Sequence, residues 1–152
     1  MLKTKMLIYV AIGSFTTSVW AAPNVWRSGY GQGFSEYSIS DTQGRTLWIS
    51  CNIGAGEQYD HSARLEIKSR SYENTNSSYP LTFKLDNKTE VAAPATTTWR
   101  NGANAWYEFS TGMAKAKKID VYLNNKKITT FQPTPASIKS VAKEIGNCKS
   151  MF

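Results

Sequence analysis

Hydrophobic and polar side chains alternate without interruption along residues 45–53. The apolar set is Leu47, Ile49, Cys51 and Ile53, and the set between them is Thr46, Trp48, Ser50 and Asn52. A period of two is typical of a strand with only one face buried. We therefore predict a half-buried strand here. Because one of the two cysteines lies on its apolar face, we expect the fold to be organised around this strand.

The same alternation recurs along the chain and predicts further short strands. They cover residues 34–40, 63–70, 81–85, 89–92, 105–109, 119–123 and 127–131. Residues 72–78 and 94–104 lack the pattern and are predicted as loops, and residues 112–117 are predicted to form a single helical turn. The glycines at 29, 31 and 33 lack the strand-before, helix-after context of a dinucleotide site, so we expect them to allow a sharp bend or a close strand crossing.

The C-terminal region changes to a helical period. Apolar residues recur three and four positions apart at Ile138, Val141, Ala142, Ile145 and Cys148. Thr134 can cap the start of this helix, with Pro135 in its first turn. Many short strands followed by one helix predict a mainly β fold. We expect an antiparallel β-sandwich or curled sheet with one C-terminal α-helix, forming a single β-rich domain over residues 22–152.

The first 21 residues have the features of a signal peptide. Lys3 and Lys5 precede a short apolar run at residues 6–13, and Val19-Trp20-Ala21 offers a cleavage site after Ala21. Pro23 would end a helix that began there, which argues against a buried N-terminal helix. No later apolar stretch is long enough to cross a bilayer. We therefore expect a periplasmic or secreted protein with no transmembrane segment after cleavage.

Export bears on the two cysteines, Cys51 and Cys148, because thiols outside the cytoplasm oxidise. Neither has the neighbouring ligands that a metal site needs, so we predict one disulfide between them. Closing a loop of this length would stabilise the fold by about 4.7 kcal/mol in the chain-entropy model.

Candidate catalytic groups are sparse. His61 is the only histidine, and its neighbours Asp60 and Ser62 are ordinary turn residues. Glu57, Asp60 and Glu108 could form a carboxylate pair only if the fold brings them together. We expect solvated carboxylates instead. The sequence therefore predicts no catalytic residue, no metal site and no cofactor.

Aromatic residues are the stronger signal. Trp99 and Arg100 lie in a predicted loop, and indole and guanidinium groups dominate the binding energy of protein interfaces. Tyr59 lies in another loop, and Trp48 lies on the face of its strand opposite Cys51. We expect these four residues to be the binding candidates. The alternative for Trp99 is a plug at the end of the sandwich, whereas Trp106 and Phe109 are expected in the core.

The chain carries 18 basic and 11 acidic residues, a formal charge of +7 that falls to +5 when Lys3 and Lys5 are removed. No basic and aromatic stripe typical of a nucleic-acid-binding protein is present, so we expect no nucleic-acid partner. Weak attraction to anionic polymers of the envelope is the more modest expectation.

Residues 79–148 resemble a layout found in small exported bacterial proteins. The matching features are Tyr79-Pro80-Leu81-Thr82-Phe83-Lys84-Leu85-Asp86, Trp99, Lys118-Ile119-Asp120-Val121-Tyr122, Thr130-Phe131 and a helix that ends in Cys148. This region is similar to the C-terminal half of the VasI/TagO-type proteins associated with type VI secretion, and to invasion-associated locus B proteins. The resemblance implies a non-enzymatic periplasmic protein and transfers no functional residue.

We therefore expect a non-enzymatic periplasmic binding protein that acts on another envelope protein, as a secretion accessory, an inhibitor or an immunity factor. The alternative is an envelope glycan-binding module or hydrolase that uses exposed aromatics and carboxylates.

Overall fold

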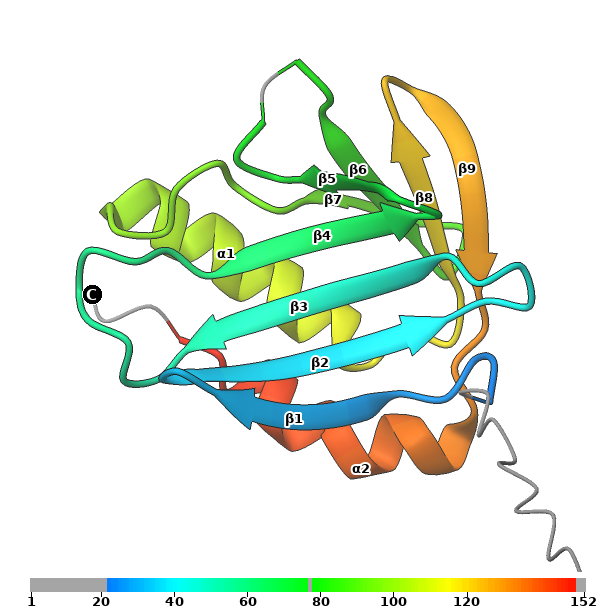
Figure 1. Ribbon diagram of the computed structural model, residues 1–152, viewed down its shortest axis with the longest axis horizontal. Helices are drawn as coiled ribbons and strands as arrows, with labels where there is room; N and C mark the ends of the chain where they lie inside the picture. The colour runs from blue at the N-terminus through cyan, green and yellow to red at the C-terminus, as the bar shows by residue number, and fades with distance from the viewer. Residues whose placement is uncertain (1–21, 77, 150–152) are drawn as a thin grey trace, which may run out of the picture.

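The computed structural model describes residues 22–76 and 78–149, so the expected signal peptide, residues 1–21, lies outside the described residues. Five strands form an antiparallel meander in the order β1-β2-β3-β4-β5, which we call the five-stranded sheet (Figure 1). They are β1 (Arg27–Gly31), β2 (Phe34–Ser40), β3 (Thr46–Asn52), β4 (Ser62–Ile67) and β5 (Arg70–Glu73). β3, the strand expected to organise the fold, is at the centre of this sheet.

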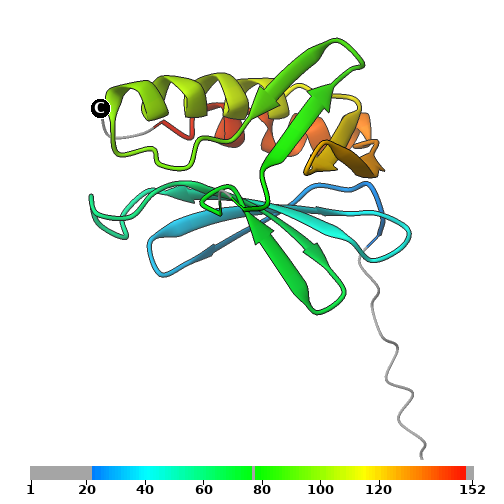
Figure 2. The same cartoon turned by 90° about the horizontal axis from the view of Figure 1, so that it is seen from above.

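A second, four-stranded antiparallel sheet has the order β7-β6-β8-β9. Its strands are β6 (Leu81–Leu85), β7 (Thr89–Ala92), β8 (Ile119–Leu123) and β9 (Lys126–Phe131). The two helices are α1 (Arg100–Met113), between β7 and β8, and α2 (Pro135–Gly146), after β9. Figure 2 shows two layers, with the five-stranded sheet in one and the helices and four-stranded sheet in the other. The mainly β fold with two antiparallel sheets and a C-terminal helix is as predicted.

The strand predicted at residues 105–109 is wrong, because one 14-residue helix covers all of it. The separate helical turn predicted at 112–117 is also wrong, since residues 112 and 113 are the end of this helix and residues 114–117 follow it outside the helix. Its buried residues recur at three- and four-residue spacing: Ala103, Trp106, Phe109, Ser110 and Met113. That spacing is helical, but a five-residue aromatic window samples too little of it to distinguish a helix from a strand. The loop predicted at residues 94–104 correspondingly ends at Trp99.

Three other expectations change. β1 was not predicted, and β5 falls partly within the loop predicted at residues 72–78. Ile53 does not continue the buried face of β3, because the strand ends at Asn52 and Ile53 is 62% exposed. Gly33 meets the expectation of a bend with a close approach. Its φ is +85°, and a Cβ there would lie against the backbone nitrogen of Ala55.

The core lies between the two layers and draws on both sheets and both helices. Its largest fully buried side chains are Trp106, Phe83, Phe109 and Phe131, so the expectation that Trp106 and Phe109 are core residues is confirmed. Cys51 of β3 and Cys148 after α2 form the predicted disulfide, with Cα atoms 5.6 Å apart. Thr134 caps α2 as expected, since its hydroxyl accepts the N–H of Ser137. No helix among the described residues is long and apolar enough to cross a membrane.

Candidate functional site

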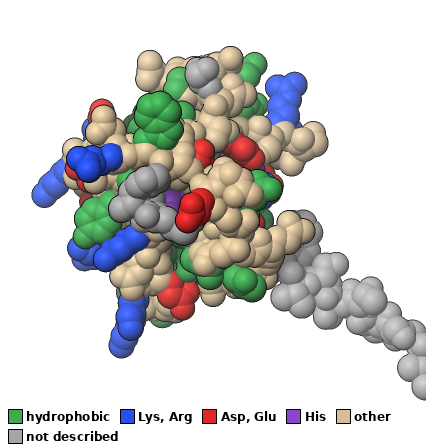
Figure 3. Space-filling view, turned by 90° about the vertical axis from the view of Figure 1, so that its left-hand side faces the viewer, with side chains coloured by type: hydrophobic (Ala, Val, Ile, Leu, Met, Phe, Trp, Pro, Cys, Tyr) green, Lys and Arg blue, Asp and Glu red, His purple; other side chains and the backbone are tan. Residues whose placement is uncertain are grey.

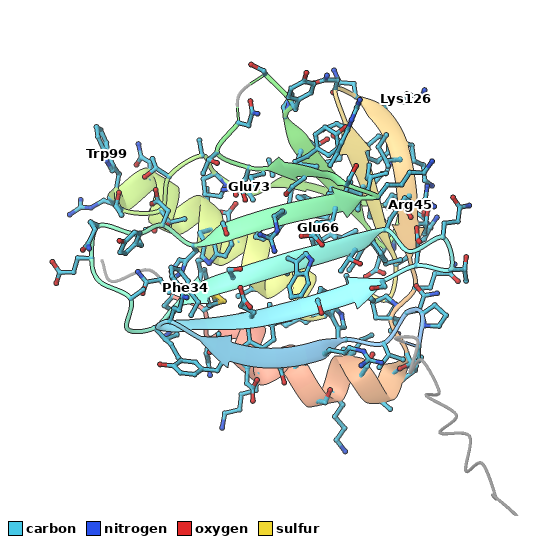
Figure 4. All side chains as sticks on the ribbon, in the orientation of Figure 1. Phe34, Arg45, Glu66, Glu73, Trp99 and Lys126 are labelled. Atoms are coloured by element: carbon cyan, nitrogen blue, oxygen red, sulfur yellow. A yellow bond between two sulfur atoms is a disulfide. The ribbon has the colours of Figure 1, made fainter. Side chains whose placement is uncertain are left out.

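Exposed hydrophobic side chains gather at the end of the molecule where β3 ends and α1 begins. We call this region the anchor surface and define it as the exposed residues Ile53, Tyr59, Trp99 and Arg100 together with the half-buried Phe34. Trp99 is 72% exposed, Ile53 62% and Tyr59 53%. Figure 4 labels Phe34 and Trp99 at this end, with Trp99 projecting outward from the start of α1. Trp99 therefore does not plug the sandwich.

Asp60 joins the two loops that carry Tyr59 and Trp99. Its Oδ1 accepts the backbone N–H groups of Thr97 and Thr98, and it also accepts the hydroxyls of Thr96 and Thr97. Burial alone would raise the pKa of Asp60, but these hydrogen bonds outweigh burial and hold the pKa below its ordinary value. The ionised carboxylate therefore fixes the segment before α1 against the β3–β4 loop.

Asn52 orders the β3–β4 loop from the other side. Its side-chain amide donates to the carbonyl oxygens of Gly56, at 2.7 Å, and Tyr59, at 2.8 Å. Its side-chain oxygen accepts the N–H groups of Gly54 and Ala55. The ring of Tyr59 also packs edge-to-face against Phe34, with centroids 6.3 Å apart. Tyr59 is thus presented on a loop held by hydrogen bonds at both ends.

His61 lies beneath this surface rather than in it. It is only 3% exposed, its ring stacks on Trp106 at 5.2 Å between centroids, and its Nδ1 accepts the N–H of Asn52 at 2.8 Å. Burial lowers its pKa, against the opposing effects of a hydrogen bond to the Lys149 backbone and the charge of Asp60. Figure 3 faces this end, and a small patch of the histidine is visible in it. These contacts give His61 a packing role.

The three carboxylates considered as acids do different things. Asp60 is held by the threonines, while Glu57 in the β3–β4 loop and Glu108 on α1 are exposed.

Across residues 22–76 and 78–149, no group of three or more His, Cys, Asp and Glu side chains could hold a metal ion. One surface hollow lies on the four-stranded sheet, away from these three carboxylates. Its lining includes Thr82, Lys84, Glu90 and Tyr122.

Trp48 is not part of the anchor surface. It lies in the middle of the outer face of the five-stranded sheet, between Ser38 of β2 and Arg64 of β4. Its indole N–H donates to Glu66 at 2.9 Å, and the Arg64 guanidinium lies 5.4 Å from its ring centroid. The structure thus brings together Tyr59, Trp99 and Arg100 of the four predicted binding residues and places Trp48 apart from them.

Sequence reasoning missed Ile53 and Phe34 as members of this surface. Ile53 continues the apolar alternation of β3, so the pattern assigned it to the core. The available signal was Gly54-Ala55-Gly56, which breaks the strand immediately afterwards and marks Ile53 as a strand-end position.

The chain matches the YfjT family model over residues 24–142. The uncharacterized protein YfjT of Escherichia coli (strain K12) is 34% identical over 146 residues, covering 94% of this chain and 92% of the relative. The uncharacterized protein YkfB of the same strain is 32% identical over 148 residues, covering 95% and 94%. No solved structure matches. The chain belongs to the YfjT family, and the resemblance to VasI/TagO-type and locus B proteins stays a prediction.

Proposed function

We propose that this member of the YfjT family is a non-enzymatic periplasmic protein that binds another protein of the cell envelope through the anchor surface. The observation that carries the proposal is the exposure of Trp99 and Tyr59 on loops that Asp60 and Asn52 hold in place. The Cys51–Cys148 disulfide supports a location outside the cytoplasm, since such bonds persist in oxidising compartments.

The composition of the anchor surface favours a protein partner. Trp, Tyr and Arg are the residues most enriched among those that dominate interface energies, and Trp99, Tyr59 and Arg100 supply one of each. Ordering an interface on binding costs free energy, and loops that are already ordered avoid much of that cost. A secretion accessory, an inhibitor or an immunity factor would each use such a preformed surface.

The test is capture of envelope proteins on immobilised mature chain, residues 22–152. The wild-type chain should retain a specific protein, and Trp99→Ala combined with Tyr59→Ala should lose it. Tyr107→Ala is the matched control, because Tyr107 is an exposed tyrosine of α1 outside the anchor surface. Retention of the same partner by the double variant would contradict the proposal, as would a hydrolytic activity that Glu57→Gln, Asp60→Asn or Glu108→Gln abolishes without unfolding the chain.

Trp48 supports the second candidate, a glycan-binding module. A partly exposed indole oriented by Glu66 and Arg64, with Ser38 and Ser50 beside it, offers a stacking surface ringed by polar groups. Retention on purified peptidoglycan that Trp48→Ala removes and Trp99→Ala leaves unchanged would favour this function over the first.

A further inference from the structure

β1 differs from the other three strands that end a sheet. An edge strand presents unpaired N–H and C=O groups, and natural proteins protect such edges with charges, lysines, bulges or very short strands. β5 and β7 have only four residues each and carry charged side chains, including Arg70, Glu73 and Glu90. β9 begins with two lysines and has a register shift opposite Val121 and Tyr122.

β1 has almost none of this protection. All five of its residues are exposed, its register with β2 is regular from end to end, and its only charged residue is the first, Arg27. Among the residues that the structure describes, only α2 extends past β1 in Figure 1, and Figure 2 shows that α2 lies in the other layer. The edge is therefore open to another strand.

The turn after β1 determines which backbone groups are free. Gln32 and Gly33 both have positive φ, 52° and 85°, so they form a two-residue turn that makes Gly31 and Phe34 a hydrogen-bonded pair. Hydrogen-bonded pairs alternate along an antiparallel ladder, so Arg27, Gly29 and Gly31 bond to β2. Ser28 and Tyr30 consequently direct their N–H and C=O groups toward the open side.

We propose that two copies of this chain pair antiparallel through β1, about a two-fold axis at Gly29, to join their five-stranded sheets into one. In this register Ser28 of one copy faces Tyr30 of the other, and both have outward backbone groups. The pairing thus makes four backbone hydrogen bonds. It is an isologous contact, in which each copy uses the same residues.

The side chains of β1 fit this register because each large residue meets a small one. Tyr30 faces Ser28 of the second copy, Arg27 faces Gly31, and Gly29 faces itself. A Cβ built on Gly29 or Gly31 has nothing within 4 Å, so the outer face of the strand is unobstructed.

Charge also permits the contact. The two Arg27 residues stand at opposite ends of the paired strands, roughly 14 Å apart at about 3.4 Å per residue. That separation exceeds the screening length of about 8 Å at physiological ionic strength. A second copy is thus favoured as the occupant because β1 is complementary to itself in size and keeps its two like charges apart.

Two cysteine variants test the register. Gly29 would face its own copy as a non-hydrogen-bonded pair, with Cα atoms about 4.5 Å apart, within the range that a disulfide spans. Gly29→Cys should therefore form a dimer linked through residue 29 under oxidising conditions, with the Cys51–Cys148 bond intact by peptide mapping. Gly31→Cys is the matched control, since it lies in the same open strand but faces Arg27, and it should remain unlinked. Equal linkage in both variants, or linkage in neither, would overturn the proposal.

Two substitutions at Ser28 test the pairing without a new thiol. Ser28→Pro removes an N–H that β2 does not use, whereas Ser28→Ala keeps it. Sedimentation of the wild-type chain and Ser28→Ala should show reversible dimers that increase with concentration, and Ser28→Pro should stay monomeric with an unchanged circular dichroism spectrum. A wild-type chain that is monomeric at every concentration, or a Ser28→Pro chain that dimerises equally, would refute pairing through β1.

Discussion

The indole N–H of Trp106 donates a hydrogen bond to the carbonyl oxygen of Cys148, with the two atoms 3.1 Å apart. This bond joins α1 to the residue whose sulfur is bonded to β3 through Cys51. The ring of His61 stacks against the indole ring of Trp106. The disulfide and this hydrogen bond therefore link three elements: β3, the segment after α2 and the middle of α1.

Removing the disulfide should loosen both helices before the sheets. Cys51→Ala or Cys148→Ala should lower the free energy of unfolding by about 2–5 kcal/mol, because the unfolded chain loses a long covalent loop. Chemical denaturation measures the loss, and hydrogen exchange should show reduced protection in α2 and around Trp106. Two free thiols in the purified native protein, or equal protection of α2 with and without the bond, would show that the fold does not depend on it.

His61 should make stability depend on pH near neutrality. Its pKa in the folded chain is lowered from 6.5 by burial, so the unfolded chain binds the proton more readily. The stability that the neutral ring contributes is fully present above about pH 6.5, the pKa of the unfolded chain. It is lost as the pH falls from there through the pKa of the folded chain. Denaturant titrations between about pH 8 and pH 5 should show this decline in the wild type. His61→Gln should show a shallower decline, and an identical slope would be evidence against the buried neutral ring.

Asp60 should make stability depend on pH at lower pH values than His61 does. Its hydrogen bonds with the threonines hold its folded pKa below 3.8, so the stability it contributes is present above 3.8 and is lost as the pH falls through the folded pKa. Asp60→Asn should cost about 1–3 kcal/mol at neutral pH, because backbone donors of Thr97 and Thr98 lose their anionic acceptor. Glu57→Gln, which removes an exposed carboxylate from the same loop, is the control, and acid titrations of both variants are followed by intrinsic tryptophan fluorescence. If Asp60→Asn and Glu57→Gln lower stability equally, Asp60 does not hold the segment before α1 against the β3–β4 loop.

Replacing Gly33 by alanine should lower the free energy of unfolding much more than replacing Gly31 by alanine. Gly33→Ala places a side chain at φ +85° and against the backbone of Ala55, so it should cost more than about 2 kcal/mol. Gly31→Ala, two residues earlier, has open space for the new methyl group and should change the free energy of unfolding much less. Thermal denaturation of the two variants measures the difference, and equal losses would mean that the turn does not approach Ala55.

Processing should remove the first 21 residues. Mass spectrometry of protein recovered from the periplasm should show a chain that starts at Ala22, with Pro23 as the neighbouring start. An intact chain beginning at Met1 in the cytoplasm would contradict export and remove the physical reason for expecting the disulfide to form.

Several parts of this structure follow from local pattern alone. The period of two placed Leu47, Ile49 and Cys51 on one face, and all three are buried. Thr134, Pro135 and the apolar spacing that follows them predicted α2, although the helix ends at Gly146 and not at Cys148 as expected. The disulfide could also be inferred, because a chain that is expected to be exported and has two cysteines has one pairing available. These features depend on neighbouring residues and on the chemistry of the compartment.

Only the tertiary structure decided the identity of α1 and the anchor surface. Trp106 and Phe109 are apolar in a strand or in a helix, and the choice depends on packing that lies far away in sequence. Likewise, Asp60 and His61 looked like surface turn residues until the loop before α1 supplied Thr97 as a partner to both. Contacts between distant segments set burial, hydrogen bonding and pKa, and the pattern within one segment does not say which other segment it meets unless a feature such as a single pair of cysteines joins them.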